Sequence, residues 1–294
     1  MSEQAYGRVS KIYADVTDCV DSNGNGVIDT STSGMLTFGT DECIAWTNDD
    51  YPRYHTVAWT RGKQDPETCE QQDELVWSTG KWNGGDHVLL LDGETGVELD
   101  LVTLQGLPDP SSLIIGSAVD VDDNLWAVYG GIIGTRRFIR VDAETLDYQI
   151  IIPPADTARS VTVDSEGYVW LCGGAVARFD PATELFQTAN VGGWRSCMAE
   201  GGQDGLLWVS SPTGLIGVDR HTLTVEATWP TPTSGGVAID RDGDVWNLED
   251  GSAHRVDPIT GDTDTYSELP SRTLSPWYDG DMTGHALAVL QSSR

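Results

Sequence analysis

The sequence predicts an all-β fold, a six-bladed β-propeller built from four-stranded blades. Three observations support this prediction: segments of about 40 residues repeat along the chain, a D-x-x-T turn recurs in each repeat, and each chain end matches only part of a repeat. Four-stranded units at this period are typical of propellers. A sandwich would not repeat its Trp and Asp so regularly, and one coil of a solenoid would be shorter.

A tryptophan marks the second strand of each expected blade. The segments SAVDVDDNLWAVYG, SVTVDSEGYVWLCG, CMAEGGQDGLLWVS and GVAIDRDGDVWNLE align, and each places an acidic residue and a Gly/Asp/Asn-rich turn before the Trp. We expect these indole rings to pack in the core. They belong to Trp126, Trp170, Trp208 and Trp246, at separations of 44, 38 and 38 residues, and Trp77 begins the series.

A second repeated position follows each tryptophan. In IRVDAETL, Asp142 is followed three residues later by Thr145. An Asp side chain can hold the backbone of a tight turn, so D-x-x-T predicts a hairpin corner, and each repeat reads as four short strands. The other pairs are Asp92/Thr95, Asp180/Thr183, Asp219/Thr222 and Asp257/Thr260.

The chain ends share the sixth blade. Five complete blades are expected at 55–105, 113–152, 158–190, 195–229 and 235–267. YDGDMTGHALAVL supplies two further strands, whereas YGRVSKIYADVTD near the N-terminus matches the third-strand register. We therefore expect residues 6–46 and 275–291 to form one composite blade, which closes the ring of a single domain over residues 1–294 and removes both open edges.

The charge balance limits the partners. Lys and Arg number 17 and Asp and Glu 46, a formal net charge of −29. We exclude nucleic acid and anionic membrane surfaces, which such a protein repels, and no apolar run of about 18 residues predicts membrane insertion. The N-terminus lacks the apolar core of a secretion signal. We expect an exported monomer, extracellular, periplasmic or at the cell surface, whose leader is missing from this sequence.

Five cysteines leave at least one without an intrachain partner. Cys19 and Cys43 bracket an acidic loop and would staple its base if oxidised. Cys172 ends a second strand and Cys197 lies in the first strand of the next blade, so we expect a disulfide there, with two buried thiols as the alternative. Cys69, in the polar insertion GKQDPETCEQQDE, is the expected odd thiol.

That acidic loop, DCVDSNGNGVIDTST at 18–32, has the spacing D-x-N-x-N-G-x-x-D. Alternate oxygens around a tight turn suit a hard cation that needs six to eight ligands. The expected Ca²⁺ ligands are Asp21, Asn23, Asn25, the Val27 carbonyl and Asp29.

The last ligand must come from outside the motif. Thr32 occupies the usual position of the bidentate carboxylate, so Asp18, Asp41 or Glu42 would complete the shell. The flanks predict strands rather than a pair of helices, which favours a structural ion over a sensor. An ordinary Asn/Gly turn and a calcium-bridged ligand site are the alternatives.

At these repeats the sequence resembles NHL-type β-propellers and, among them, the virginiamycin B (streptogramin) lyase family. The blades of that family are similar to GVAIDRDGDVW and HRVDPITG, which stand within 236–261 here. The resemblance covers nearly the whole chain and implies the propeller fold. It also implies a lyase that opens a cyclic depsipeptide by elimination, with a His base and Mg²⁺ near acidic residues. In this chain His55 and Glu249 stand at such positions, in different blades, and the second His of the family is missing.

The first strand of each blade is expected to line the central channel, where His55, Arg159 and Arg195 would face one funnel. Two arginines there could grip a carboxylate or phosphate bidentately, or they could pair with local acids. His55 is a candidate general base or a rim residue. The acids are Asp156, Asp164 and Glu200, and the aromatic candidates for stacking on a sugar or peptide are Trp82, Trp194, Trp229 and Trp277.

These features favour an exported, non-enzymatic binding or scaffold module with a structural calcium site. A small anionic ligand, a carbohydrate or a protein or peptide partner would bind at the channel face. The alternatives are a streptogramin-lyase-like enzyme that uses a divalent metal, and one structural module of a larger surface protein. Fold alone does not decide between them, but the missing second His favours binding.

Overall fold

The structure is a computed structural model. It describes residues 2–3, 7–13, 15–30, 39–60, 62–64, 67, 71–130, 136–193, 196–201, 205–231, 235–240, 242–249 and 252–267. The chain divides into two compact units, residues 1–57 and 62–105 (unit 1) and residues 58–61 and 106–294 (unit 2).

The described residues of unit 2 form four antiparallel sheets of four strands, and in each sheet the strands pair in chain order. The first sheet is β10 (Leu113–Val119), β11 (Leu125–Gly130), β12 (Arg137–Val141) and β13 (Tyr148–Ile151). The second is β14 (Ser160–Val163), β15 (Val169–Cys172), β16 (Val176–Asp180) and β17 (Leu185–Ala189). The third is β18 (Cys197–Gly201), β19 (Leu206–Ser211), β20 (Gly214–Val218) and β21 (Val225–Pro230). The fourth is β22 (Gly236–Ile239), β23 (Val245–Glu249), β24 (Ser252–Val256) and β25 (Thr263–Ser267).

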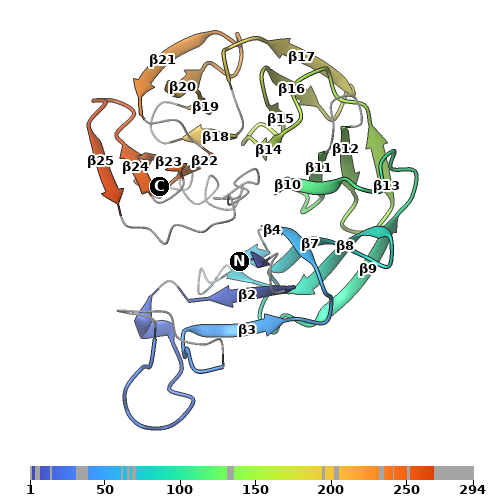
Figure 1. The fold of residues 1–294 in the computed structure, drawn as a ribbon, viewed down its shortest axis with the longest axis vertical. Helices are drawn as coiled ribbons and strands as arrows, with labels where there is room; N and C mark the ends of the chain where they lie inside the picture. Colours follow the sequence, from blue (N-terminus) through green and yellow to red (C-terminus); the bar gives the residue numbers. More distant parts are fainter. Residues whose placement is uncertain are drawn as a thin grey trace. The chain divides into compact units, whose positions relative to one another are not determined.

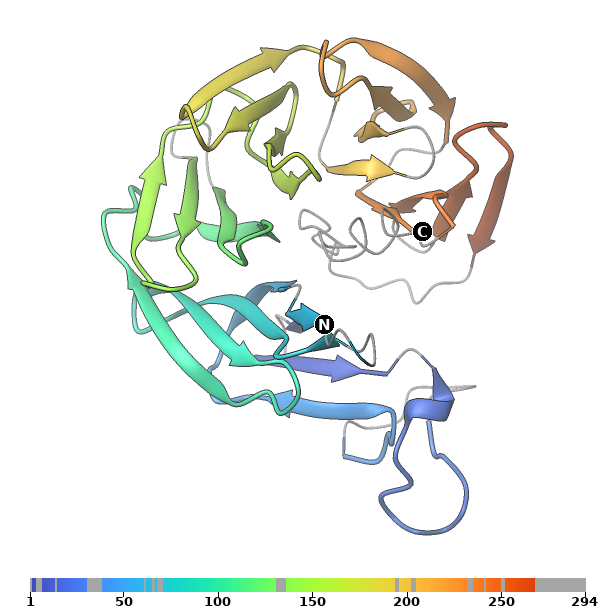
Figure 2. The same ribbon diagram turned by 180° about the vertical axis from the view of Figure 1, so that it is seen from behind.

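The first strands of unit 2 lie next to one another. Strand β10 contacts β14, β14 contacts β18, and β18 contacts β22. Figure 1 and Figure 2 show these strands on the inner side of unit 2 and the fourth strands on its outer side. This is the arrangement of propeller blades, in which each sheet packs face to face on the next.

The repeated tryptophans form the core between successive sheets, as the sequence predicts. The Trp126 ring lies 5.0 Å from Phe138 in its own sheet and 5.7 Å from Phe179 in the next, measured between centroids. Trp170 and Trp208 join clusters with apolar residues of the sheets that follow them. These residues therefore link neighbouring sheets. Truncating such a ring to alanine typically lowers the free energy of unfolding by about 3–5 kcal/mol.

An aspartate at the end of the first strand orients each of three tryptophans. The indole N–H of Trp126 donates to Asp120 at 2.7 Å, and the same bond joins Trp170 to Asp164 and Trp246 to Asp240, at 2.8 and 2.9 Å. The third sheet differs, because its β18–β19 register shifts between Met198 and Gly201. There the Trp208 indole nitrogen is buried with no hydrogen-bond partner among the described residues.

Unit 1 contains the sheet β4 (Tyr54–Trp59), β7 (Leu75–Trp82), β8 (Gly85–Asp92) and β9 (Glu98–Leu104). A second sheet pairs β1 (Ser2–Glu3), β2 (Arg8–Ile12) and β3 (Ile44–Asn48), and β5 (Lys63–Gln64) pairs with β6 (Gln71–Gln72). Lys11 and Trp46 both donate to the Gly93 carbonyl, at 3.1 and 3.0 Å, which ties the two larger sheets together.

Strands β2 and β3 lie in the N-terminal segment that we assign to the composite blade. Its other part, residues 275–291, lies outside the described residues. The closure of a six-bladed ring stays a prediction. The one helix of the described residues is the 3-10 turn η1 (Val16–Asp18), and no described helix has the length and apolarity to cross a membrane.

The D-x-x-T turns adopt one conformation in all five repeats. The aspartate accepts bonds from the backbone or hydroxyl of its threonine, as in Asp219 and Thr222 at 2.6 and 2.9 Å. The residue after the threonine has a positive φ and donates its N–H to the aspartate carbonyl. These residues are Gly96, Leu146, Glu184, Leu223 and Gly261, with φ of 71°, 61°, 58°, 61° and 77°.

Gly261 provides a test of this packing. We expect Gly261→Ala to destabilise unit 2 by about 2–4 kcal/mol, because its φ is left-handed and a Cβ there would overlap the Trp229 ring. The matched control is Gly167→Ala, at φ 85° with nothing within 4 Å of the added Cβ. It should lose only the backbone term, about 1 kcal/mol. Equal losses of unfolding free energy in urea melts would contradict the role of the Trp229 contact.

Candidate functional site

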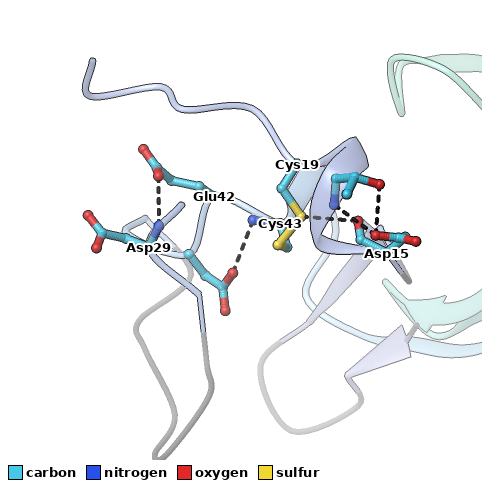
Figure 3. Close-up of a disulfide and its surroundings, with 7 residues drawn as sticks. Asp15, Cys19, Asp29, Glu42 and Cys43 are labelled. Carbon is cyan, nitrogen blue, oxygen red and sulfur yellow. Dashed lines mark hydrogen bonds between the residues drawn. A yellow bond between two sulfur atoms is a disulfide. The ribbon is translucent and has the colours of Figure 1, made fainter. Parts of the chain in front are cut away.

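The acidic loop belongs to unit 1 and lies between strands β2 and β3. The chain passes through η1, follows the loop motif and returns to β3 at Ile44. A disulfide joins Cys19 to Cys43 with the Cα atoms 4.6 Å apart, which confirms this expected pair. Figure 3 shows the disulfide beside η1, with Glu42 and Asp29 on the same side of the loop base. The disulfide therefore brings the two ends of the insertion together.

Asp21 organises the turn of the motif. Its Oδ1 accepts the backbone N–H groups of Gly24 at 2.6 Å and Asn25 at 3.2 Å, and its Oδ2 accepts that of Gly26 at 2.7 Å. Both glycines have left-handed backbones, with φ of 70° and 82°. The expected position 1 of the loop thus folds the backbone around one carboxylate.

The side chains at positions 3, 5 and 9 converge. The amide nitrogens of Asn23 and Asn25 donate to the same oxygen, Oδ2 of Asp29, at 3.0 and 3.1 Å. All three residues are exposed. Two carboxamides and a carboxylate therefore meet on one side of the loop, and their binding of a cation stays a prediction. Val27, at position 7, is exposed.

Glu42, which follows Asp29 by 13 residues, bonds back to the loop motif. Its Oε1 accepts the N–H groups of Ser22 at 2.9 Å and Asn23 at 3.1 Å, and its Oε2 accepts that of Asp29 at 2.9 Å. These bonds, that from Asp29 first, lower the pKa of the Glu42 carboxyl. Glu42 is buried and adjacent to Cys43. Among the three acids that the sequence offers for completing the shell, Glu42 bonds to the motif, and Asp41 accepts the N–H of Cys43.

The donors of this loop suit a hard cation. Carboxylate, carboxamide and backbone carbonyl oxygens are the ligands that Ca²⁺ takes. In the described part of the chain, no three Asp, Glu, His or Cys side chains group closely enough to hold a metal by themselves. A calcium ion here would depend on Asn and backbone oxygens beside Asp21, Asp29 and Glu42. So few charged ligands are typical of weak extracellular sites, with Kd of about 10⁻⁴–10⁻³ M.

His55 lies in β4 of unit 1, half-buried. Burial first, and then the positive charges of Arg53 and Lys81, lower its pKa to about 4. Lys81 is paired with Asp86 at 2.9 Å, and its backbone N–H donates to the Arg53 carbonyl at 3.2 Å. The imidazole is therefore neutral at neutral pH, and it lies near the positive charges of Arg53 and Lys81.

Arg159 precedes β14 in unit 2, and its backbone N–H donates to the Cys172 carbonyl at 2.8 Å. Its side chain is half-buried and makes no ion pair within the described part of the chain. Of the three acids that we considered for it, Asp164 is instead paired with Arg220 at 3.1 Å, and the side chain of Glu200 lies outside the described residues. Arg195 lies outside the described residues, as does the side chain of Glu249. The expected grouping of His55 with the two arginines, and the pairing of His55 with Glu249, stay predictions.

Two of the tryptophans that we considered for stacking on a sugar or peptide, Trp82 and Trp229, lie among the described residues, and both pack against other side chains. Trp82 is buried between the rings of Tyr51 and His87, both stacked on it at 4.1 Å between centroids. Trp229 covers Gly261. Both faces of the Trp82 ring are thus covered, so this ring is not free to stack on a sugar. Trp194 and Trp277 lie outside the described residues, as does Cys69.

The second expected disulfide is also present. Cys172 of β15 and Cys197 of β18 are bonded, with their Cα atoms 5.9 Å apart, and both are fully buried. This bond joins two neighbouring sheets of unit 2. Two disulfides are typical of proteins that fold in an oxidising compartment.

No family model and no curated protein matches the chain. Solved structures match it at the level of fold. The extracellular domain of a protein assigned to a hybrid two-component system from B. thetaiotaomicron aligns with a TM-score of 0.51 and 10% identity, over 83% of this chain and 30% of that one. The Dos1 propeller aligns with a TM-score of 0.50 and 14% identity, over 78% and 64%, and U3-55K with 0.51 and 10%, over 76% and 69%.

The chain therefore spans less than a third of the B. thetaiotaomicron domain and about two thirds of the Dos1 propeller. At these identities the likeness concerns the fold alone. Together with the four-stranded sheets, it establishes an all-β protein of the β-propeller kind.

Proposed function

We propose that this chain is an exported β-propeller module that binds a small anionic ligand without chemical turnover and is stabilised by a calcium ion in its loop. The observation that carries the binding part is Arg159, a half-buried cation without an ion pair among the described residues of a protein with a net charge of −29. A guanidinium at such a position favours a carboxylate or phosphate, which it can hold with two parallel hydrogen bonds.

Export is supported by the two disulfides, since such bonds persist in oxidising compartments. The fold neighbour from B. thetaiotaomicron is an extracellular domain, which agrees with this location. A protein or peptide partner with acidic side chains would use the same chemistry as a small anion.

Closure by both chain ends is part of the proposal. Trp126, Trp170 and Trp208 are fully buried because the next sheet covers each of them. Trp246 is half-buried and stacks at 5.3 Å on Tyr266, which is 46% exposed. A following blade over this face would complete the series. Residues 275–291 together with β2 and β3 are the segments that we assign to it.

Deleting residues 1–14 tests this closure. The deletion removes β2, the third strand of the composite blade, and leaves an exposed edge that can pair with another chain. We expect aggregation, or a melting temperature lowered by several degrees, in light scattering and thermal denaturation. A monomeric truncated protein with unchanged melting would mean that the ring closes elsewhere.

Calcium removal tests the loop. A ligand at a hundredfold above its Kd stabilises the folded state by about 2.7 kcal/mol, so adding calcium to metal-stripped protein should raise the melting transition of unit 1 by several degrees. Asp21→Ala and Glu42→Gln should each remove this increment. Asp18→Ala, an exposed aspartate outside the bonds of the loop, is the matched control and should retain it. Identical melting of the stripped protein with and without calcium would reject the site.

Anion titration tests the ligand site. We expect phosphate or a dicarboxylate to bind in calorimetry, and Arg159→Ala to weaken binding by about 1.5–3 kcal/mol, the contribution of a hydrogen bond to a charged group. Arg137→Ala, in a different sheet, is the control. The same samples should leave a cyclic depsipeptide intact in the presence of Mg²⁺. Ring opening that disappears in His55→Ala would overturn binding without turnover and favour the lyase alternative.

A further inference from the structure

The acidic loop contains two Asn–Gly steps, Asn23–Gly24 and Asn25–Gly26. At such a step the glycine nitrogen can attack the asparagine side-chain carbonyl carbon, because glycine has no side chain to block the approach. A third Asn–Gly step, Asn83–Gly84, forms the exposed turn between β7 and β8. It provides a comparison within the same molecule.

Both attacking nitrogens in the loop are bonded to one carboxylate. The N–H of Gly24 donates to Oδ1 of Asp21 at 2.6 Å, and the N–H of Gly26 donates to its Oδ2 at 2.7 Å. A carboxylate within hydrogen-bond reach is positioned to accept a proton as the nitrogen attacks. Within the described residues, neither Gly84 nor Asn83 has such a partner.

The side-chain carbonyls under attack also carry hydrogen bonds. The N–H of Asn25 donates to Oδ1 of Asn23 at 3.0 Å, and the N–H of Val27 donates to Oδ1 of Asn25 at 2.8 Å. Backbone donors aimed at a carbonyl oxygen stabilise the negative charge that it develops when the carbon is attacked. At each Asn–Gly step of the loop, a carboxylate therefore lies at the attacking glycine nitrogen. A backbone N–H lies at the asparagine carbonyl that is attacked.

We propose that the loop deamidates itself at Asn23 and Asn25, with Asp21 as the general base. The glycine nitrogen bonds to the asparagine Cγ while its proton passes to Asp21. The bond from Cγ to the amide nitrogen then breaks, and ammonia leaves with that proton, which gives a succinimide. Water opens the succinimide at one of its two carbonyls and yields Asp or isoaspartate, with no change of oxidation state.

The consequence for the loop rests on the proposed calcium site. An Asp at position 3 or 5 replaces a neutral ligand by a charged one, and the ligand charge count tunes calcium affinity. Isoaspartate adds a methylene to the backbone and breaks the alternation of ligand oxygens. Deamidation would thus divide the protein into a tighter and a weaker calcium-binding form.

Peptide mass spectrometry of the full chain, incubated at neutral pH without calcium, tests the proposal. We expect Asn23 and Asn25 to deamidate about tenfold faster than Asn83, or more, since general base catalysis contributes at least that much. Asp21→Asn should slow the two loop sites to the Asn83 rate and leave Asn83 unchanged. The matched control Asp18→Asn should leave all three rates unchanged.

Two outcomes would overturn the proposal. Equal rates at the three steps would mean that the loop does not promote the reaction. An unchanged or faster rate in Asp21→Asn would mean that the bonds of Asp21 protect the loop asparagines instead. Disulfide mapping and circular dichroism of each variant identify the folded samples, so that only folded protein enters the comparison.

The calcium consequence has its own measurement. The Asn23→Asp/Asn25→Asp variant should bind calcium tighter than the parent by on the order of tenfold or more, because each added carboxylate attracts the ion directly. If neither protein binds calcium in calorimetry, the calcium proposal fails while the mass-spectrometric result stands. The two proposals can therefore fail separately.

Discussion

The hydrogen bond between an aspartate and the repeated tryptophan determines how three sheets of unit 2 are built and how they pack. In the second sheet of unit 2, Asp164 is fully buried, so its charge needs full hydrogen bonding. It accepts the backbone N–H groups of Glu166 and Tyr168 and the indole N–H of Trp170. One carboxylate thus closes the first hairpin and fixes the ring that fills the space against the next sheet.

The same carboxylate also joins neighbouring sheets. Arg220, at the turn between the third and fourth strands of the following sheet, pairs with Asp164 at 3.1 Å and donates to the Gly205 carbonyl at 2.7 Å. Breaking a buried pair by removing one partner typically costs about 3–5 kcal/mol. In the first sheet Asn124 replaces the arginine, with its amide nitrogen on Asp120 and its Oδ1 accepting the N–H of Ala143. The equivalent aspartates of the two sheets are thus bonded by different side chains, Arg220 and Asn124. Each of these side chains also bonds to the backbone of a second turn.

Much of the fold could be predicted from the sequence, because its signals are local and repeated. The aspartate-to-tryptophan interval and the D-x-x-T turn each correspond to one hydrogen-bonded corner, and the disulfide between Cys172 and Cys197 follows from their places in adjacent sheets. The role of Trp82 could not be predicted, since the rings of Tyr51 and His87 that cover it come from a loop and a different strand. The hydrogen bonds from the loop motif to Glu42 could not be predicted either, because they depend on where the chain returns after the loop.

That return explains how a sheet can carry such an insertion. Strands β2 and β3 pair from Val9 opposite Asn48 to Ile12 opposite Ile44, so the ladder forms from residues outside the loop. The entropy of closing a loop grows only slowly with its length, and the disulfide and Glu42 join its ends where the sheet already brings them together. The loop motif has little apolar contact of its own, since Val20 and Val27 are 61% and 63% exposed. Its order depends on polar contacts to Asp21, Asp29 and Glu42, which are the groups that a cation would also bind. The sheet therefore sets where the loop begins and ends, while polar contacts within the loop set its conformation.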